Sequence, residues 1–117
     1  MSMQWVSYKG KRILSLDYTE MDEASMLKQV EAYHRLLATE TDVRQLTNFA
    51  DATVPKSVLE RAKQLATENP DSRNAKIALI GVNKHQKAYV FTYNFYTKGK
   101  AQLFGSKEEA MEWLASD

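Results

Sequence analysis

The side chains with the clearest capacity for chemistry are two histidines, His34 and His85, and fifteen carboxylates. The histidines do not form a His-x-x-x-His pair, so we expect a structural or surface role for both. No Gly-x-Ser-x-Gly elbow of a serine hydrolase occurs. The four glycines permit neither a Walker loop nor a dinucleotide-binding fingerprint, and the lack of cysteine removes thiolate metal sites and cysteine nucleophiles. We therefore expect no enzymatic activity, no catalytic residue, no metal and no cofactor.

Most of the carboxylates lie where a helix start or a solvated face favours negative charge. One group precedes or opens the first expected helix and another lies in the last: Glu20, Asp22 and Glu23, and Glu108, Glu109 and Glu112. A paired acid–base role stays open, but nothing in the sequence favours it over capping and solubility.

The turn from Asn48 to Thr53 is the first candidate binding surface. It links an expected strand to an expected helix, and ligands of open α/β sheets bind outside the carboxyl ends of strands, where helix N-termini attract anions. Asn48, Asp51 and Thr53 would line such a site. The alternative, which the residues favour, is an ordinary connecting loop in which Asp51 or Thr53 caps the helix.

The aromatic segment from His85 to Tyr96 is the second candidate. Its alternation by period two indicates a strand, whereas the order of elements along the chain favours a helix, which is our prediction. Wound as a helix, it has a phenylalanine side and a separate tyrosine stripe of Tyr89, Tyr93 and Tyr96. An exposed stripe would suit self-association or an apolar ligand. Packing in the core is the favoured alternative, because small domains need their aromatic residues inside.

Composition places the chain among single soluble domains, here residues 1–117. It is 44% hydrophobic and 26% charged, with a formal net charge of +1. That charge does not favour nucleic acid, and the lysines flank the aromatic segment instead of interleaving with it. No apolar run approaches the roughly 20 residues of a membrane span, and no signal-peptide core occurs. We expect a cytoplasmic protein without a membrane span and without a nucleic-acid partner.

Strands and helices are expected to alternate over most of the chain. Two strands within Trp5–Leu16 should turn at Gly10, and a helix should run from a Thr19–Asp22 capping pair to about Thr39. Further on, the patterns predict a strand over Val43–Phe49, a helix from Pro55 to Asn69-Pro70, a buried strand over Ala75–Val82, a short strand over Ala101–Phe104 and a last helix capped at Ser106.

In this order, several stretches resemble the SpoIIAA-like family, relatives of the STAS domain that share a fold with CRAL-TRIO lipid carriers. The resembling stretches are Tyr8–Leu14 with Leu16–Tyr18, Lys76–Val82, Tyr93–Lys100 and, most tellingly, Phe104–Leu114. The resemblance implies an α/β fold with a single mostly parallel sheet, its first strand antiparallel, and about four helices, one of them the aromatic segment.

The resemblance also implies a place for regulation. In STAS regulators, the loop after a central strand carries a serine whose phosphorylation switches binding to a partner kinase. The matching loop here is the Asn48–Thr53 turn, where the nearest hydroxyls are Thr53 and Ser57 and the characteristic Asp-Ser pair is absent.

Two functions follow as hypotheses. The first is a non-enzymatic interaction or regulatory module of STAS-like type, with an unidentified protein partner or a second copy of the chain bound at the strand-end loop or the tyrosine stripe. The alternative is a carrier of a small hydrophobic or lipid-like ligand, by analogy with the CRAL-TRIO fold alone.

Overall fold

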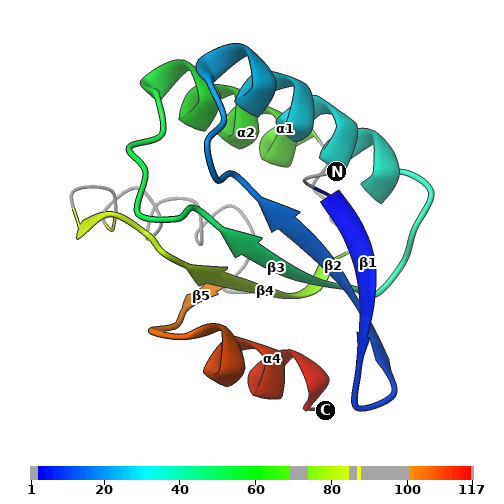
Figure 1. Cartoon of the computed structure of the whole chain (residues 1–117). Coiled ribbons are helices and arrows are strands. Elements are labelled where there is room, and N and C mark those ends of the chain that lie inside the picture. Colours follow the sequence, from blue (N-terminus) through cyan, green and yellow to red (C-terminus); the bar gives the residue numbers. More distant parts are fainter. Residues whose placement is uncertain (1–2, 69–73, 85–86, 88–100, 117) are drawn as a thin grey trace.

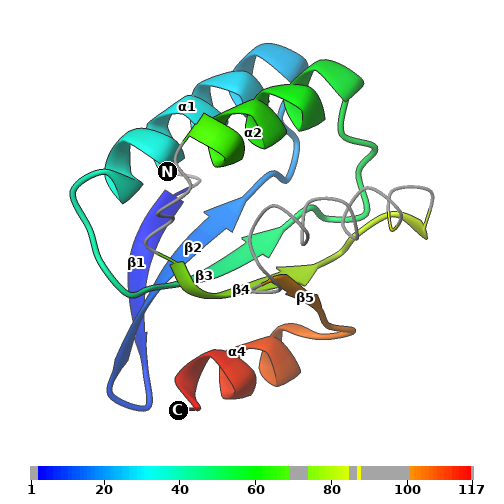
Figure 2. The same ribbon diagram turned by 180° about the vertical axis from the view of Figure 1, so that it is seen from behind.

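A five-stranded sheet with helices on both faces forms the framework of the protein. In the computed structural model, α1 and α2 cover one face and α4 covers the other (Figures 1 and 2). The structure describes residues 3–68, 74–84, 87 and 101–116. The strands are β1 (Met3–Tyr8), β2 (Lys11–Asp17), β3 (Val43–Asn48), β4 (Asn74–Ile80) and β5 (Ala101–Leu103), and the helices are α1 (Glu23–Leu37), α2 (Lys56–Glu68) and α4 (Lys107–Ala115).

The sheet has the strand order β1-β2-β3-β4-β5. β1 runs antiparallel to β2, and the other neighbours are parallel. The α/β class, the single mostly parallel sheet and its antiparallel first strand are thus as expected. Three helices lie within the described residues, against the four or so expected. The remaining expected helix, His85–Tyr96, falls almost wholly outside them, and so does the tyrosine stripe.

The β1–β2 hairpin turns at two residues with positive φ, Lys9 at 49° and Gly10 at 81°. Positive φ at both central residues characterises the type I′ turn, whose twist matches that of the flanking strands. Tyr8 pairs with Lys11 directly across it. The prediction of a tight turn at Gly10 is therefore confirmed.

Helix α1 begins at the N-cap Asp22, whose carboxylate accepts a hydrogen bond from the Ser25 backbone N–H. The expected pairing of Thr19 with Asp22 is wrong, because Thr19 donates to the Asp17 carboxylate instead. The apolar stripe of the helix is buried, as predicted, at Met26, Val30, Tyr33 and Leu37.

Strand β4 lies inside the sheet, and its side chains alternate between the two helical layers. Ile77 and Leu79 line the α1–α2 side, whereas Ala78 and Ile80 pack in the cluster that contains α4. All four are at most 8% exposed. A strand that is covered on both faces explains the unbroken apolar run from which it was predicted.

Helices α2 and α4 also begin close to the residues that the sequence predicts. Pro55 precedes α2, and its carbonyl accepts from the Val58 backbone N–H. Ser106 is the N-cap of α4 and accepts from the Glu109 backbone N–H, as the capping box predicts. No helix within the described residues is long and apolar enough to span a membrane.

Two cations from neighbouring strands hold the C-terminal end of α4. Arg44 on β3 donates to the carbonyls of Leu114 and Ser116. Lys76 on β4 donates to the Trp113 and Ser116 carbonyls, both at 2.8 Å, and its ammonium lies 5.0 Å from the centre of the Trp113 ring. Carbonyls at the C-terminal end of a helix are short of partners within the helix, although that of Trp113 also accepts from the Ser116 backbone N–H. A cation is favourable at the negative end of the helix dipole. We call this arrangement the C-terminal clasp.

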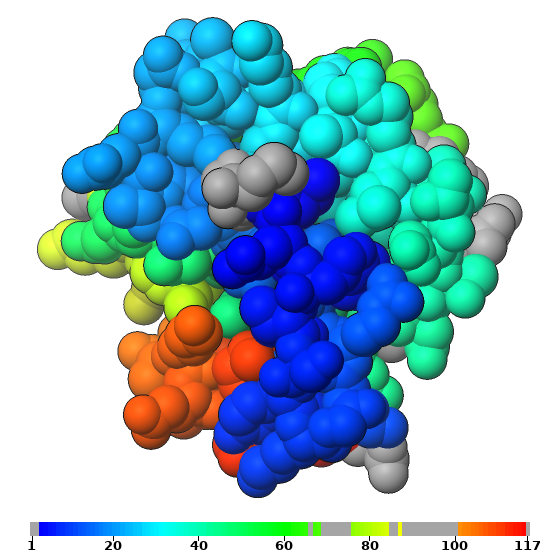
Figure 3. Space-filling model, turned by 45° about the vertical axis from the view of Figure 1, so that its right-hand side comes forward, coloured from blue at the N-terminus to red at the C-terminus, as the bar shows by residue number. Residues whose placement is uncertain are grey.

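The hairpin holds the same helix from the side. Glu112 accepts hydrogen bonds from the Tyr8 hydroxyl and the Lys9 ammonium. Figure 3 shows the blue hairpin against the orange and red surface of α4, with α1 on the opposite side of the hairpin. Helix α4 is therefore attached to three strands of the sheet.

We predict that Lys76→Met lowers the free energy of unfolding by about 1–2 kcal/mol, because it removes one charged donor from the Trp113 and Ser116 carbonyls, which keep their bonds from Ser116 N–H and Arg44. Urea denaturation at neutral pH measures the change. The control is Lys56→Met, which removes only an exposed ion pair with Glu60 and should cost less than about 0.5 kcal/mol. Equal effects of the two substitutions would show that the clasp contributes nothing.

Candidate functional site

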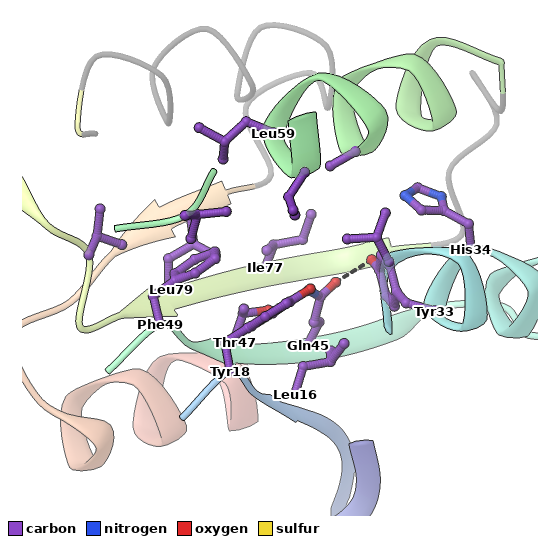
Figure 4. Close-up of a pocket in the computed structure, with 15 residues that line it drawn as sticks. Leu16, Tyr18, Tyr33, His34, Gln45, Thr47, Phe49, Leu59, Ile77 and Leu79 are labelled. Carbon is purple, nitrogen blue, oxygen red and sulfur yellow. Dashed lines mark hydrogen bonds between the residues drawn. The ribbon is translucent and has the colours of Figure 1, made fainter. Parts of the chain in front are cut away.

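A mostly apolar pocket lies between the α1–α2 pair and the sheet. Fifteen described residues line it: Leu16, Tyr18, Val30, Tyr33, His34, Gln45, Thr47, Phe49, Val54, Val58, Leu59, Ala62, Ile77, Leu79 and Val82. Its volume is about 80 Å³, which is room for several water molecules or for a short apolar group. In Figure 4, Phe49 and Leu79 lie toward one end and His34 lies at the other.

The floor of the pocket carries a short row of hydrogen-bonded polar side chains. The Tyr33 hydroxyl donates to Oε1 of Gln45, and Nε2 of Gln45 donates to the Thr47 hydroxyl at 2.6 Å (Figure 4). All three residues are buried. Gln45 and Thr47 are two positions apart on β3, so they share the face that meets α1. The row satisfies polar groups that the core would otherwise leave unpaired.

His34 differs from this row because its Nδ1 atom is buried and has no hydrogen-bond partner. The ring packs edge-on against Tyr33, with 4.9 Å between the ring centres. Burial lowers the pKa of His34 to about 4 despite the opposing charge of Glu31, and the nearby Arg61 lowers the pKa further. The imidazole is therefore neutral at neutral pH, with one nitrogen as donor and the other as acceptor.

Tyr18 and Phe49 close another part of the lining by stacking, with 5.3 Å between ring centres and 14° between ring planes. Burial raises the pKa of the Tyr18 hydroxyl to about 12, partly offset by its hydrogen bond with Gln29. The hydroxyl is therefore neutral at neutral pH, and its ring acts as an apolar wall.

The ion pair between Glu31 and Arg61 joins α1 to α2 beside His34. Its hydrogen bond holds the pKa of the Glu31 carboxyl below its usual range and raises that of Arg61. Both side chains remain one-third or more exposed, so this pair sets the local charge and contributes little to stability.

The Asn48–Thr53 turn brings the three predicted site residues into one loop beside the end of β4. Oδ1 of Asn48 accepts from the Ala50 backbone N–H at 2.8 Å, and Asp51 N–H donates to the Gly81 carbonyl at 2.7 Å. The Thr53 hydroxyl accepts from Nδ2 of Asn83 at 3.3 Å. The loop is thus fixed by its own polar groups, and its role as a binding surface stays a prediction.

The two hydroxyls near this loop differ in their surroundings. Ser57, in the first turn of α2, donates to the Glu23 carboxylate and so links the starts of α2 and α1. A phosphate on Ser57 would meet this carboxylate and be repelled. Thr53 is exposed. Of the two residues that the family resemblance suggests for modification, only Thr53 has surroundings compatible with added negative charge.

The polar row is the part of the site that sequence reasoning missed. Gln45 and Thr47 interrupt the apolar residues of the expected Val43–Phe49 strand, which is a signal for paired polar groups on one face. Tyr33 was taken as an ordinary member of the α1 stripe, and the histidine next to it as structural. Their convergence depends on how α1 lies on β3, which no local pattern contains.

Compared with protein-family models, with curated proteins and with solved structures, the chain gives no match. Its resemblance to the SpoIIAA-like family therefore stays a prediction from the sequence. Within the described ranges, no group of three or more His, Asp or Glu side chains is placed to hold a metal ion.

A substitution at Gly81, which lies against Ala50, tests how tightly the Asn48–Thr53 loop is held. The φ of Gly81 is +65°, and an added Cβ would lie 2.7 Å from Ala50 N. We predict that Gly81→Ala lowers the free energy of unfolding by about 2–4 kcal/mol, the sum of backbone strain and overpacking. Gly10→Ala is the control, because φ is +81° there and a Cβ would meet nothing within 4 Å. Urea denaturation should show a clearly smaller loss for Gly10→Ala, and equal losses would mean that the close approach is unimportant.

The pKa of His34 predicts a pH dependence of stability. Between pH 6.5 and about 4, the unfolded chain binds a proton at His34 that the folded protein does not, so stability falls as the pH falls. The total loss is on the order of 3 kcal/mol. Urea denaturation at several pH values measures it in a His85→Gln background, where His34 is the last histidine. His34→Phe should flatten the curve above pH 4.5, and an unchanged slope would contradict the prediction.

Proposed function

We propose that the protein is a non-enzymatic binding module that holds a small, mostly apolar molecule in the pocket between the α1–α2 pair and the sheet. The observation that carries the proposal is a core cavity of about 80 Å³ that keeps an organised polar row among apolar walls. Binding sites for small molecules combine an apolar lining with a few placed polar groups in this way.

The size of the pocket limits the ligand. An engineered cavity of about 150 Å³ in another protein encloses benzene, so a cavity of about 80 Å³ encloses a short chain or only part of a ring. The pocket is neither sealed nor flat, so a longer molecule would extend out of it. Among the two functions expected from the sequence, this geometry favours the ligand carrier.

The regulatory reading remains compatible with the same proposal. Phe49 lines the pocket and also begins the loop that the STAS resemblance assigns to partner binding. Ala52 N–H donates to the Phe49 carbonyl, so a ligand that displaces the ring would act directly on the loop. Binding of the molecule would then change the conformation of the loop, and the loop would carry that change to a protein partner.

Helix α2 supplies the position at which to test the pocket. Ala62 is half-buried in its lining, and a larger side chain there would fill the space. We predict that p-xylene binds to the protein with a dissociation constant in the millimolar range or tighter, and that Ala62→Phe weakens binding at least 10-fold. Chemical shifts of the leucine, valine and isoleucine methyl groups, followed by NMR during a titration, measure both constants.

The matched control is Ala24→Phe, which adds the same bulk at an exposed position of α1 and should leave binding unchanged. Native mass spectrometry of the tag-free protein, followed by a denaturing run, shows whether a natural ligand is already bound. Absence of p-xylene binding to the ligand-free protein, or equal binding by Ala62→Phe, would overturn the proposed function.

A further inference from the structure

His34 is the pocket-lining side chain that carries an unpaired buried atom. Among the described side chains, its Nδ1 is the one buried polar atom without a hydrogen-bond partner. Leaving such an atom unpaired costs roughly 1–3 kcal/mol, and native proteins keep few of them. The neighbouring groups do not relieve it: Tyr33 donates to Gln45, and Arg61 is bonded to Glu31. A group that the pocket receives from outside would give this nitrogen its partner.

The rest of the lining restricts the charge of that group. None of the fifteen described lining residues is Asp, Glu, Lys or Arg. A carboxylate or phosphate placed among them would lose its hydration without gaining an opposite charge, and a cation would do the same. The described walls therefore select a neutral molecule.

The unpartnered nitrogen further restricts the polar group. A neutral imidazole carries its proton on either Nδ1 or Nε2, so Nδ1 is a donor in one form and an acceptor in the other. A hydroxyl can both donate and accept, so it matches either form, whereas a carbonyl matches only one. In the structure Nδ1 is covered. Contact with a ligand therefore requires the ring to turn about its Cβ–Cγ bond, a torsion with broad minima.

Resting on the proposed function, we propose that the ligand class is a neutral apolar alcohol or phenol whose hydroxyl hydrogen-bonds to Nδ1 of His34. The apolar body then lies along Val58, Leu59 and Ile77, towards the end of the pocket that Phe49 and Leu79 form (Figure 4). His34 thus sets the specificity of the pocket, and the surrounding aliphatic side chains set its affinity for the apolar body.

Three probes with the same body separate these contributions. p-Xylene carries no hydrogen-bonding group, p-cresol replaces one methyl group by a hydroxyl of the same size, and p-toluate carries a negative charge. We expect p-cresol to bind about 3- to 10-fold more tightly than p-xylene, as one buried hydrogen bond to a neutral group predicts, and p-toluate to bind most weakly. NMR titrations of the methyl groups at pH 7 give the three dissociation constants.

His34→Phe keeps a ring in the same place and removes both nitrogens. Because it replaces an unpaired polar atom by an apolar one, the variant should fold. We expect this variant to lose the preference for p-cresol over p-xylene, so that the ratio of its two dissociation constants falls to about 1. In the unchanged protein, the ¹⁵N shift of Nδ1 should move on addition of p-cresol and stay in place on addition of p-xylene, which a merely structural histidine would not show.

The outcomes also separate this inference from the proposed function. Equal binding of p-xylene and p-cresol, or a p-cresol preference that survives in His34→Phe, would overturn the role of His34 and leave the apolar pocket intact. Tightest binding of p-toluate would overturn the neutral ligand class. Failure of p-xylene to bind would overturn the proposed function itself.

Discussion

In the middle of a strand that is covered on both faces, a polar side chain does not reach bulk water. β3 is under this constraint, because Leu46 packs in the α4 cluster while Gln45 and Thr47 face the α1–α2 side. Their amide and hydroxyl groups need partners inside the protein, and Tyr33 supplies the first of them. Helix α1 must therefore be rotated about its own axis so that Tyr33 points to Gln45. The same rotation turns the next residue, His34, towards α2, so the pocket and its unpaired nitrogen follow from one buried hydrogen bond.

Much of the fold could be predicted because its signals are local. The turn at Gly10, the cap at Ser106 and the apolar run of β4 each depend on a few neighbouring residues and on simple steric or electrostatic rules. The cap of α1 was predicted less well. Thr19 and Asp22 both carry side-chain oxygens suited to capping, and only the path of the chain decides that Thr19 bonds to Asp17.

The site could be predicted only in part, because its residues come from separate elements. The Asn48–Thr53 loop was found from its position at a strand end, which is a rule of the whole fold class. The pocket has no such rule: it is the space left between the α1–α2 pair and the sheet, and its size depends on small lining residues such as Ala62 of α2. His34 stood out in the sequence as a rare residue type, but its burial beside Tyr33 depends on tertiary packing.

The C-terminal clasp has a consequence for the order in which the chain folds. Its hydrogen bonds join residues 70 and 37 positions apart, and its two cations come from different strands. Neither cation is in place until β3 and β4 lie side by side, so closing these long loops must precede the docking of α4. Helix α4 can therefore complete its contacts only after the sheet has formed, and contacts that form late in folding slow unfolding more than they speed folding. A helix of nine residues thereby adds kinetic resistance to opening of the sheet.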